Sequence, residues 1–484
     1  MNTKLTSNKE LNIFEALMPL VVLIALLAIN VLGVYGDDAL SGSNQFVLLV
    51  GAAVAMVVGF YNKVSYEFMI EKVADNFKST AGAILILLMV GALAGAWMIS
   101  GIIPSMIYYG LKVLNPSIFL PACLIICAII SVATGSSWTT AATVGIALIG
   151  IGDAMGISKG MVAGAVISGA YFGDKMSPLS DTTNLASAMA GAKLFDHIKY
   201  MMFTTIPSVL VALVVFIILS FKQTPSSDIN TAELLSSIEA SFNITPLLFI
   251  VPLIVIILII KKTKPLIALF AGTLLGGLFA LMFQPGIVST VGGSETLNFV
   301  SAYKGIMNAF TVDVAVETSN TQLNDLFSSG GMSGMLGTIW LIMCAMVFGG
   351  VMEAIGALQR ISQALLSMAK SIFGLFASTV ASCLALNITA SDQYLSLVVS
   401  GKMYKQAYED RGLAPENLSR TLEDSGTVTS VLIPWNTCGA YQSGVLGVSV
   451  SEYFVYAVFN YVSPIMTLIF AAFGIKIKQL VKGK

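Results

Sequence analysis

The chain has 484 residues, of which 56% are hydrophobic and only 11% are charged, and its mean hydropathy is +0.87. Soluble domains carry about a quarter charged residues, so this composition excludes a soluble globular protein and indicates an integral membrane protein. A formal net charge of -1 excludes the basic surface that nucleic-acid binding needs.

The first apolar run follows a polar segment, residues 1–10, and is long enough to stay in the membrane, so we expect no cleaved signal peptide. Further along, the charged segment 61–79 suits either a helix on the cytoplasmic surface or a solvated loop, and 297–330 is expected to be a loop. A membrane span needs about 20 mostly apolar residues. The sequence therefore predicts an all-α polytopic protein with about ten transmembrane helices, at 14–34, 45–61, 80–102, 158–186, 200–221, 243–261, 264–284, 334–358, 420–445 and 451–476.

Two further apolar stretches, 117–151 and 371–402, are each interrupted near the middle by small polar residues. The interruptions run from Thr134 to Thr140 and from Asn387 to Asp392. We expect both stretches to be re-entrant helical hairpins that enter the membrane and return on the same side. Their polar tips would line a protected cavity, because irregular backbone at that depth is tolerated only there.

The placement of Lys and Arg favours cytoplasmic positions for both termini. Most of the 25 basic residues fall in segments that this arrangement places inside. The acidic stretches 37–38, 228–239 and 313–325 fall outside, together with four lysines: Lys112, Lys159, Lys222 and Lys304. We therefore expect a multi-pass protein of the inner (plasma) membrane of a prokaryote.

The hairpins and their neighbouring spans form two inverted repeats, because the same series of elements occurs twice with opposite starting sides. Ser137 is expected to correspond to Asn387, and Thr139 to Thr389. Inverted repeats place substrate and ions at the membrane midplane; two halves that are alike only in composition are the alternative. The expected division is N-terminal scaffold helices with the cytoplasmic segment (1–79), a first repeat (80–221), a linker with scaffold helices and an outside loop (222–333), a second repeat (334–476) and a cytoplasmic tail (477–484).

The span at 158–186 contains the most informative segment of the chain. It places Asp174, Lys175, Pro178 and Asp181 among hydroxyl side chains and between apolar flanks. Charge at membrane depth is costly unless it is paired, so these residues indicate a functional site. Pro178 also allows the helix to open and to turn its carbonyl oxygens toward a bound cation.

The span at 420–445 is predicted to be broken in the same way. Pro434-Trp435-Asn436-Thr437 is the counterpart of Pro178-Leu179-Ser180-Asp181, so two hairpin tips and two opened helices are expected to converge. Hard cations prefer oxygen ligands, which favours a small ion such as sodium over transition metals. The candidate ion- or substrate-binding residues are Ser136, Ser137, Thr139, Asp174, Ser177, Ser180, Asp181, Thr182, Asn184, Asn387, Thr389, Asp392, Asp424, Thr427, Asn436 and Thr437.

Sodium itself is expected at Asp181, Ser137, Thr182 and Asn387. Asp174 and Asp181 would share one helix face, two turns apart. A poorly hydrated cavity favours the protonated carboxyl group and a nearby cation favours the carboxylate, so sodium and a proton would compete for one acid. Lys175 either neutralises Asp174 as a structural ion pair or is displaced by sodium. Asp392 and Asp424 either bind ions or cap helices.

Several other residues have two interpretations. Glu353 belongs either to a proton route or to an exposed helix end, and His197 suits a surface role or a pH sensor. Trp138 and Trp435 either wall the cavity or pack in an ordinary way. The five cysteines are expected to be free, because Cys123 and Cys127 have no further ligand nearby to complete a metal site.

The run from Gly173 to Ala186 resembles the most characteristic motif of the NhaC family of sodium/proton antiporters, and Gly135-Ser136-Ser137-Trp138-Thr139 adds to the resemblance. The similarity extends from about residue 14 to 476. It implies an ion-transporter architecture with inverted repeats and re-entrant hairpins, and a homodimer formed through a separate scaffold. Some members are sodium/proton antiporters, whereas others exchange malate and protons for lactate and sodium, or couple sodium to an amino acid.

We therefore expect a sodium/proton antiporter that works by alternating access in the lipid bilayer and needs no cofactor. The alternative is sodium-coupled transport or exchange of an amino acid or a small organic acid. Arg360, Arg411 and Arg420 are expected in loops or at span ends, and the lack of an arginine at the site disfavours a dicarboxylate, although helix N-termini at the tips could hold an anion. An enzyme is not expected, because no nucleophile has a neighbouring histidine base; a channel is the remaining alternative.

Overall fold

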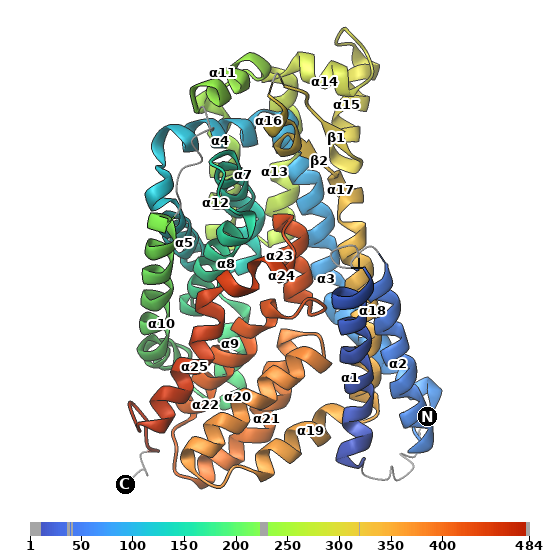
Figure 1. Cartoon of the computed structure of the whole chain (residues 1–484), viewed down its shortest axis with the longest axis vertical. Helices are drawn as coiled ribbons and strands as arrows, with labels where there is room; N and C mark the ends of the chain where they lie inside the picture. Colours follow the sequence, from blue (N-terminus) through green and yellow to red (C-terminus); the bar gives the residue numbers. More distant parts are fainter. Residues whose placement is uncertain (1–10, 36–38, 40–41, 223–230, 319, 481–484) are drawn as a thin grey trace.

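The computed structural model describes residues 11–35, 39, 42–222, 231–318 and 320–480 of the chain (Figure 1). The first ten residues and the last four, which belong to the predicted N-terminal scaffold segment and the predicted cytoplasmic tail, lie outside this part. Within the described ranges the strands are a single two-residue ladder, β1 (Val314–Ala315) with β2 (Ser328–Ser329). Eight helices have the length and composition of membrane spans, or ten if each of two bent helix pairs is one span. The all-α polytopic fold is thus confirmed.

The first four helical segments pack beside one another and form one side of the molecule with α18 (Leu336–Ala354) (Figure 1). They are α1 (Ile13–Ala28), the π-helical η1 (Ile29–Val34), α2 (Ser43–Tyr61) and α3 (Tyr66–Ile99).

Helix α3 continues without a break from the charged segment into the span, so the prediction of a separate element at 61–79 is wrong. Ser65 caps its first turn by accepting a hydrogen bond from the Phe68 N–H at 3.2 Å. No proline follows to end the helix before Ile99. Lys72 forms an ion pair with Glu353 at 2.9 Å, and both side chains remain partly exposed. Glu353 is thus partly exposed and paired near the end of α18, as the helix-end alternative expects.

The first hairpin begins directly after α4 (Ile102–Val113) and returns to it. Gly135 ends its first arm with φ 70°, and Ser136 caps the second arm. Because the last segment of the second arm packs on α4, both ends of the hairpin lie together, as predicted. The arms are α5 (Pro116–Thr134) and the continuous series α6 (Ser137–Thr140), η3 (Ala141–Gly145) and α7 (Ile146–Ala154).

The second hairpin consists of α20 (Ile372–Thr389) and α21 (Gln393–Asp410), which pack side by side. It lies toward the lower end of Figure 1, whereas α5 and α7 lie toward the upper end. This opposite placement is typical of inverted repeats. Asp392 caps α21 as Ser136 caps α6, so these two residues correspond, and the predicted match of Ser137 with Asn387 is out of register.

Each repeat also contains a broken helix. In the first, α8 (Lys159–Met176) stops before Pro178, and α9 (Asp181–Ala190) begins after Ser180. Asp174 and Asp181 consequently lie on two helices, and the prediction that they share one helix face is wrong. In the second, the successive segments are α22 (Pro415–Leu422), the π-helical η5 (Glu423–Thr427), the 3₁₀ turn η6 (Ser430–Leu432) and α23 (Thr437–Leu446).

Close packing of α5 against α8 fixes the first hairpin beside the first broken helix. A Cβ atom at Gly169 would lie 2.2 Å from the Leu124 carbonyl oxygen, and one at Gly173 would lie 2.5 Å from the Ser131 Cβ. Small residues allow helix backbones to approach this closely. The contact places the hairpin tip against the break at Pro178.

The remaining helices connect and surround the repeats. Residues 297–330 were expected to be a loop, but α15 and the β-ladder occupy much of this segment. Two bent pairs occur, with angles of 82° and 52°. The elements are α10 (Leu194–Lys222), α11 (Thr231–Ser241), η4 (Pro246–Phe249), α12 (Ile250–Ile260), α13 (Pro265–Phe283), α14 (Pro285–Val291), α15 (Phe299–Thr311), α16 (Thr321–Leu326), α17 (Gly331–Gly334), α19 (Ala357–Ser367), α24 (Val450–Tyr453), η7 (Phe454–Tyr456) and α25 (Val458–Ala472).

After α25 the chain returns to the start of α22. The Leu480 N–H donates to the Gly412 carbonyl at 2.7 Å, and the Ala414 N–H donates to the Lys478 carbonyl at 2.9 Å. Lys478 also forms an ion pair with Glu416 at 2.6 Å. These contacts tie the last described residues to the helix that leads into η5.

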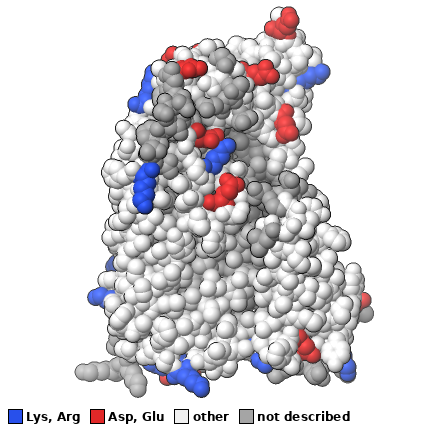
Figure 2. Space-filling view, viewed as in Figure 1, with Lys and Arg blue, Asp and Glu red and all other residues white. Residues whose placement is uncertain are grey.

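Charged side chains on the face in Figure 2 lie mainly toward its upper and lower ends. The surface between them is largely uncharged. Such a band suits contact with the hydrocarbon core of a bilayer.

Candidate functional site

A cavity of about 750 Å³ lies where the first hairpin tip, the first broken helix and α21 meet. Asp174, Asp181 and Thr182 line it from the broken helix, and Tyr394 lines it from α21. It extends to the α12–α13 loop, from which Lys262 and Lys264 line it. Other lining residues are Ser79, Gly82, Ala83, Ser136, Trp138, Thr139, Pro178, Leu179, Lys262 and Lys264.

Asp174 joins the broken helix to the hairpin tip. Its Oδ2 accepts hydrogen bonds from the Ser137 N–H at 3.1 Å and from the Ser137 hydroxyl at 2.7 Å. Ser136 accepts from the Thr139 N–H at 3.1 Å and thereby caps the helix of the tip. The carboxylate thus occupies the start of a helix, where the exposed N–H groups favour negative charge.

The break between α8 and α9 is stabilised by its own side chains. Asn184 donates to the carbonyl oxygens of Pro178 at 3.0 Å and Ser180 at 2.7 Å. Ser177 accepts from the Leu179 N–H at 3.2 Å, and Ser180 caps α9. Asn184, Ser177 and Ser180 therefore hold the break open and are not on the cavity wall.

Asp181 is exposed at the first position of α9, and Thr182 is buried beside it. Of the four predicted sodium ligands, these two line the cavity directly. Ser137 lies behind Asp174, to which it is hydrogen-bonded. Asn387 is fully buried at the second kink, and its Oδ1 has no hydrogen-bond partner among the described residues.

The second hairpin tip is clamped to the second broken helix. The Thr437 N–H donates to the Ser391 carbonyl at 2.9 Å, and the Asn436 amide donates to the Asn387 carbonyl at 3.0 Å. Asp392 accepts from the Leu395 N–H at 3.0 Å, so the capping role is present in the structure. Thr389 donates to Ala385 within its own helix. Asn387, Asn436 and Thr437 thus meet at this clamp, whereas Thr389 and Asp392 bond within their own hairpin, and none of the five is among the residues that line the cavity.

Lys175 forms a fully buried ion pair with Asp424, and not with Asp174 as one prediction held. Neighbouring positions on a helix point in different directions, so Asp174 faces the hairpin tip while Lys175 faces the other repeat. Asp424 additionally accepts from three hydroxyl groups, those of Thr204 at 2.7 Å, Ser463 at 3.2 Å and Thr467.

A second contact crosses between the repeats. The rings of Trp138 and Tyr441 stack with centroids 3.9 Å apart, and the Tyr441 hydroxyl donates to the Trp138 carbonyl at 3.2 Å. Together with the Lys175–Asp424 pair, this stack brings both broken helices and both hairpins into one connected region.

Glu423 is a buried acid that the sequence analysis did not select. Its side chain is fully buried, and among the described residues no ion pair or well-aligned hydrogen bond holds its carboxyl oxygens. The hydroxyl groups of Thr182 and Thr427 lie close enough to interact with it, and Lys175 and Asp174 are the charged groups that influence it most. Thr427 is also a predicted site residue. The sequence signal for Glu423 is the acidic pair Glu423-Asp424 in the second broken helix, of which the predicted site includes only Asp424.

Two predictions about basic residues are wrong. His197 is buried rather than on the surface, because α10 already includes it, and its Nδ1 lies 2.7 Å from the Ser419 hydroxyl. Arg420 is fully buried in α22 rather than at an open span end, with its guanidinium 4.5 Å above the Tyr200 ring. Neither side chain is among those that line the cavity.

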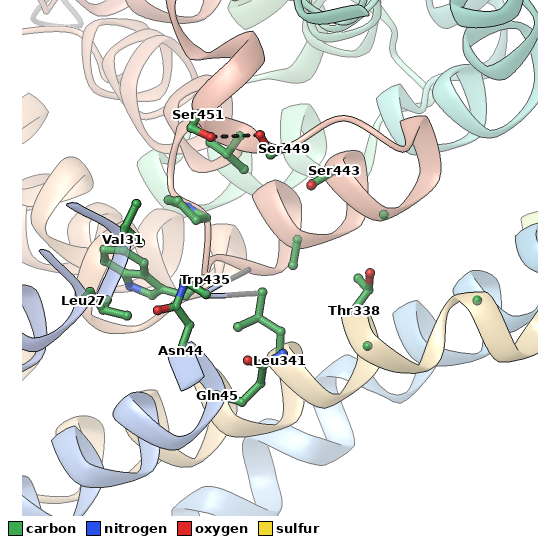
Figure 3. Close-up of a pocket in the computed structure, with 17 residues that line it drawn as sticks. Leu27, Val31, Asn44, Gln45, Thr338, Leu341, Trp435, Ser443, Ser449 and Ser451 are labelled. Carbon is green, nitrogen blue, oxygen red and sulfur yellow. Dashed lines mark hydrogen bonds between the residues drawn. The ribbon is translucent and has the colours of Figure 1, made fainter. Parts of the chain in front are cut away.

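A smaller cavity of about 280 Å³ lies at the second broken helix, between α1, α2 and α18 (Figure 3). Figure 3 shows Trp435 close to Asn44, with Thr338 on α18 and Ser443 on α23. The Trp435 indole N–H donates to the Ile388 carbonyl at 2.8 Å, so this ring separates the cavity from the second hairpin.

Residues 169–475 match the family described as the Na+/H+ antiporter family. The chain is 36% identical to the Na(+)/H(+) antiporter NhaC of Alkalihalophilus pseudofirmus, over 88% of this chain and 90% of that protein. It is 37% identical to the Na(+)/H(+) antiporter NhaC of Bacillus subtilis, over 83% and 86% of the two chains. It is also 36% identical to the malate-2H(+)/Na(+)-lactate antiporter of Bacillus subtilis, over 91% and 89%.

Proposed function

Because this chain belongs to the Na+/H+ antiporter family, we propose that it exchanges sodium for protons across a prokaryotic plasma membrane by alternating access. One structural observation supports the proposal in addition to the sequence similarity. The polar interruptions of two oppositely placed repeats meet, and two acids, Asp174 and Asp181, line a cavity there. Acids at such a place are the expected means of binding a cation and a proton in turn.

Sodium would bind on the cavity side of the first broken helix. Asp181 offers an exposed carboxylate, and Thr182 offers a hydroxyl oxygen next to it. Ser137 and Asn387, the other two predicted ligands, lie behind the residues that line the cavity and would contribute to sodium binding from there. All four supply the oxygen donors that a hard cation prefers.

The test uses the purified protein in proteoliposomes that contain a pH-sensitive dye. A sodium pulse should move protons in the wild type, and Asp181→Asn should lose this sodium dependence while inserting normally. Glu353→Gln is the matched control, since Glu353 lies in a partly exposed ion pair away from the cavity. Unchanged sodium dependence in Asp181→Asn would refute the site, and no proton movement in the wild type would refute the antiporter.

A second candidate is sodium-coupled exchange of a small organic acid or amino acid. The cavity favours it, because about 750 Å³ far exceeds the space of one ion, and the aromatic side chains of Trp138 and Tyr394 line it. One relative is named as a malate–lactate antiporter. Accumulation of labelled solute without proton movement would favour this candidate, and a rise in melting temperature with each solute would identify the ligand.

We further propose that both termini lie in the cytoplasm, so that the large cavity opens inward. The basic residues of the α12–α13 loop, Lys262 and Lys264, stand at its mouth, which agrees with an excess of positive charge inside. The homodimer remains a proposal from the family resemblance, which the mass of the detergent-solubilised protein would test.

A further inference from the structure

The smaller cavity at the second broken helix is built from the counterparts of residues that line the larger cavity of about 750 Å³. Three pairs of lining residues share one separation in sequence: Gly82 and Thr338, Pro178 and Pro434, and Leu179 and Trp435. The first residue of each pair lines the larger cavity, and the second lines the smaller one. Each cavity thus lies between a broken helix and a long span, α3 in the first repeat and α18 in the second.

The remaining walls correspond as well. The connection between α12 and α13 lines the larger cavity, whereas the end of the first span and the start of α2 line the smaller one through Val31 and Asn44. Helix α13 packs against α3 as α2 packs against α18. Equivalent surfaces of inverted repeats face opposite sides of the membrane. Since the larger cavity is proposed to open to the cytoplasm, the smaller one belongs to the outside.

The two cavities differ in how far they reach toward the hairpin tips. The larger cavity extends past Leu179 to the first tip, where Ser136 and Thr139 line it. In the second repeat the Trp435 indole N–H donates to the Ile388 carbonyl at 2.8 Å, and none of the described residues of the second tip lines the smaller cavity. The Trp435 ring therefore stands between this cavity and the second kink, where Asn387, a predicted sodium ligand, is buried.

The lining of the smaller cavity suits the passage of a cation rather than its retention. Asn44, Thr338 and Ser443 supply oxygen donors (Figure 3), and among the described residues that line it none is charged. Hard cations prefer oxygen ligands, and a path must bind its ion weakly enough to release it. The cavity volume of about 280 Å³ exceeds the roughly 30 Å³ that one water molecule occupies, so a sodium ion can enter with part of its hydration shell.

We propose that the smaller cavity is the outer entrance for sodium, and that Trp435 closes its inner end in this structure. When the indole leaves the Ile388 carbonyl, sodium passes from the cavity to Asn387 at the second kink. While the indole stays bound, sodium in the larger cavity is separated from the outside, as exchange without leakage requires. This assignment rests on the proposed sodium/proton exchange.

Thiol labelling from each side of sealed vesicles tests the entrance in the full-length protein. A charged, membrane-impermeant methanethiosulfonate should modify Thr338→Cys from the outside and its counterpart Gly82→Cys from the cytoplasmic side. The five native cysteines are buried, so the wild type should not react. Modified Thr338→Cys should lose most of its sodium-driven proton movement. Modification of Thr338→Cys only from the cytoplasmic side or from neither side, or unchanged transport after complete modification, would overturn the entrance.

Cys438 is a native reporter for the role of Trp435. It lies in the second broken helix, is fully buried and is not among the residues that line the smaller cavity. Trp435→Ala should let the reagent reach Cys438 from the outside, and the added change Cys438→Ser should abolish this reaction. Leu341→Ala is the matched control, because it enlarges the same cavity and leaves the ring in place, so Cys438 should stay protected.

Protection of Cys438 in a folded Trp435→Ala variant would overturn the role of Trp435, as would equal modification in Leu341→Ala. Trp435→Phe keeps an aromatic ring but lacks the N–H donor, so it should give a modification rate between those of the wild type and Trp435→Ala. This variant also tests the role if Trp435→Ala does not fold. Failure of the antiporter proposal is distinguishable, since it appears as absent proton movement in the wild type and leaves the labelling pattern unchanged.

Discussion

At the first hairpin tip Gly135 takes the left-handed conformation, with φ 70°, and Ser136 caps the following helix. At the second tip Ser391 takes the same conformation, with φ 58°, and Asp392 is the cap. The same separation in sequence relates three further pairs: Pro178 and Pro434, Ser180 and Asn436, Ser131 and Asn387. The side chains of the last pair also make corresponding hydrogen bonds. Ser131 donates to the Ala170 carbonyl at 2.6 Å, and Asn387 donates to the Gly426 carbonyl at 2.8 Å. The two repeats therefore share one backbone design.

The charged residues do not follow this symmetry. The positions that correspond to Asp174 and Lys175 in the first repeat hold Ser430 and Val431 in the second. Those that correspond to Glu423 and Asp424 hold Ile167 and Ser168. The larger cavity is lined by two acids, whereas Ser443, Thr338 and Trp435 line the smaller one. The comparison teaches that both repeats supply a similar kink, whereas their charged residues are distributed unequally, with two acids at the larger cavity.

The largest expected effect comes from the charge pair that crosses between the repeats. Lys175→Met leaves Asp424 buried without its counter-charge, which should reduce the free energy of unfolding by about 3–5 kcal/mol. The loss should appear as a lower melting temperature and a lower yield of folded protein. The double variant Lys175→Met/Asp424→Leu should recover much of the loss. Equal stability of the single variant and the wild type would refute a structural pair.

The hairpin tips test the shared backbone. Gly135→Ser puts the residue of the second tip into the first, where a Cβ atom would meet Leu179 at 2.6 Å. The left-handed conformation and the crowding together should lower the free energy of unfolding by about 1–3 kcal/mol. The reverse change, Ser391→Gly, removes a strained side chain and should be neutral or stabilising. Thermal unfolding of both variants measures the two changes in stability. A loss of stability in Ser391→Gly as large as that in Gly135→Ser would show that Ser391 is not strained as predicted, and that the two tips are not equivalent.

Much of the fold follows from local signals. Prolines next to runs of hydroxyl residues mark the broken helices, and polar runs mark the hairpin tips, because both kinds of residue compete with helical hydrogen bonding. Proline alone is not sufficient, since α1 and α10 continue through Pro19 and Pro207. The partner of Lys175 and the complete burial of Glu423 could not be predicted in this way. Both depend on how helices far apart in sequence rotate about their axes and pack. The charged residues of 61–79 predict a boundary, but no residue there breaks a helix, so α3 continues through them.

The smallest expected effect concerns the end of the chain. Its hydrogen bond to Glu416 raises the pKa of Lys478 above the usual value. The pair therefore stabilises the fold below about pH 10.4, and this contribution disappears as the pH rises through the raised pKa. Lys478 is half exposed, so Lys478→Met should cost only about 0–1 kcal/mol. Faster proteolysis of the tail in the variant at neutral pH, with little difference in strong alkali, would confirm the pair.

The same tail has a consequence for regulation. Its residues hold the beginning of α22, and α22 continues directly into the turn that contains Glu423 and Asp424. A continuous helical path therefore leads from the last described residues to the buried acids Glu423 and Asp424. A ligand that holds or releases residues 478–480 is therefore expected to change the transport rate without entering the cavity.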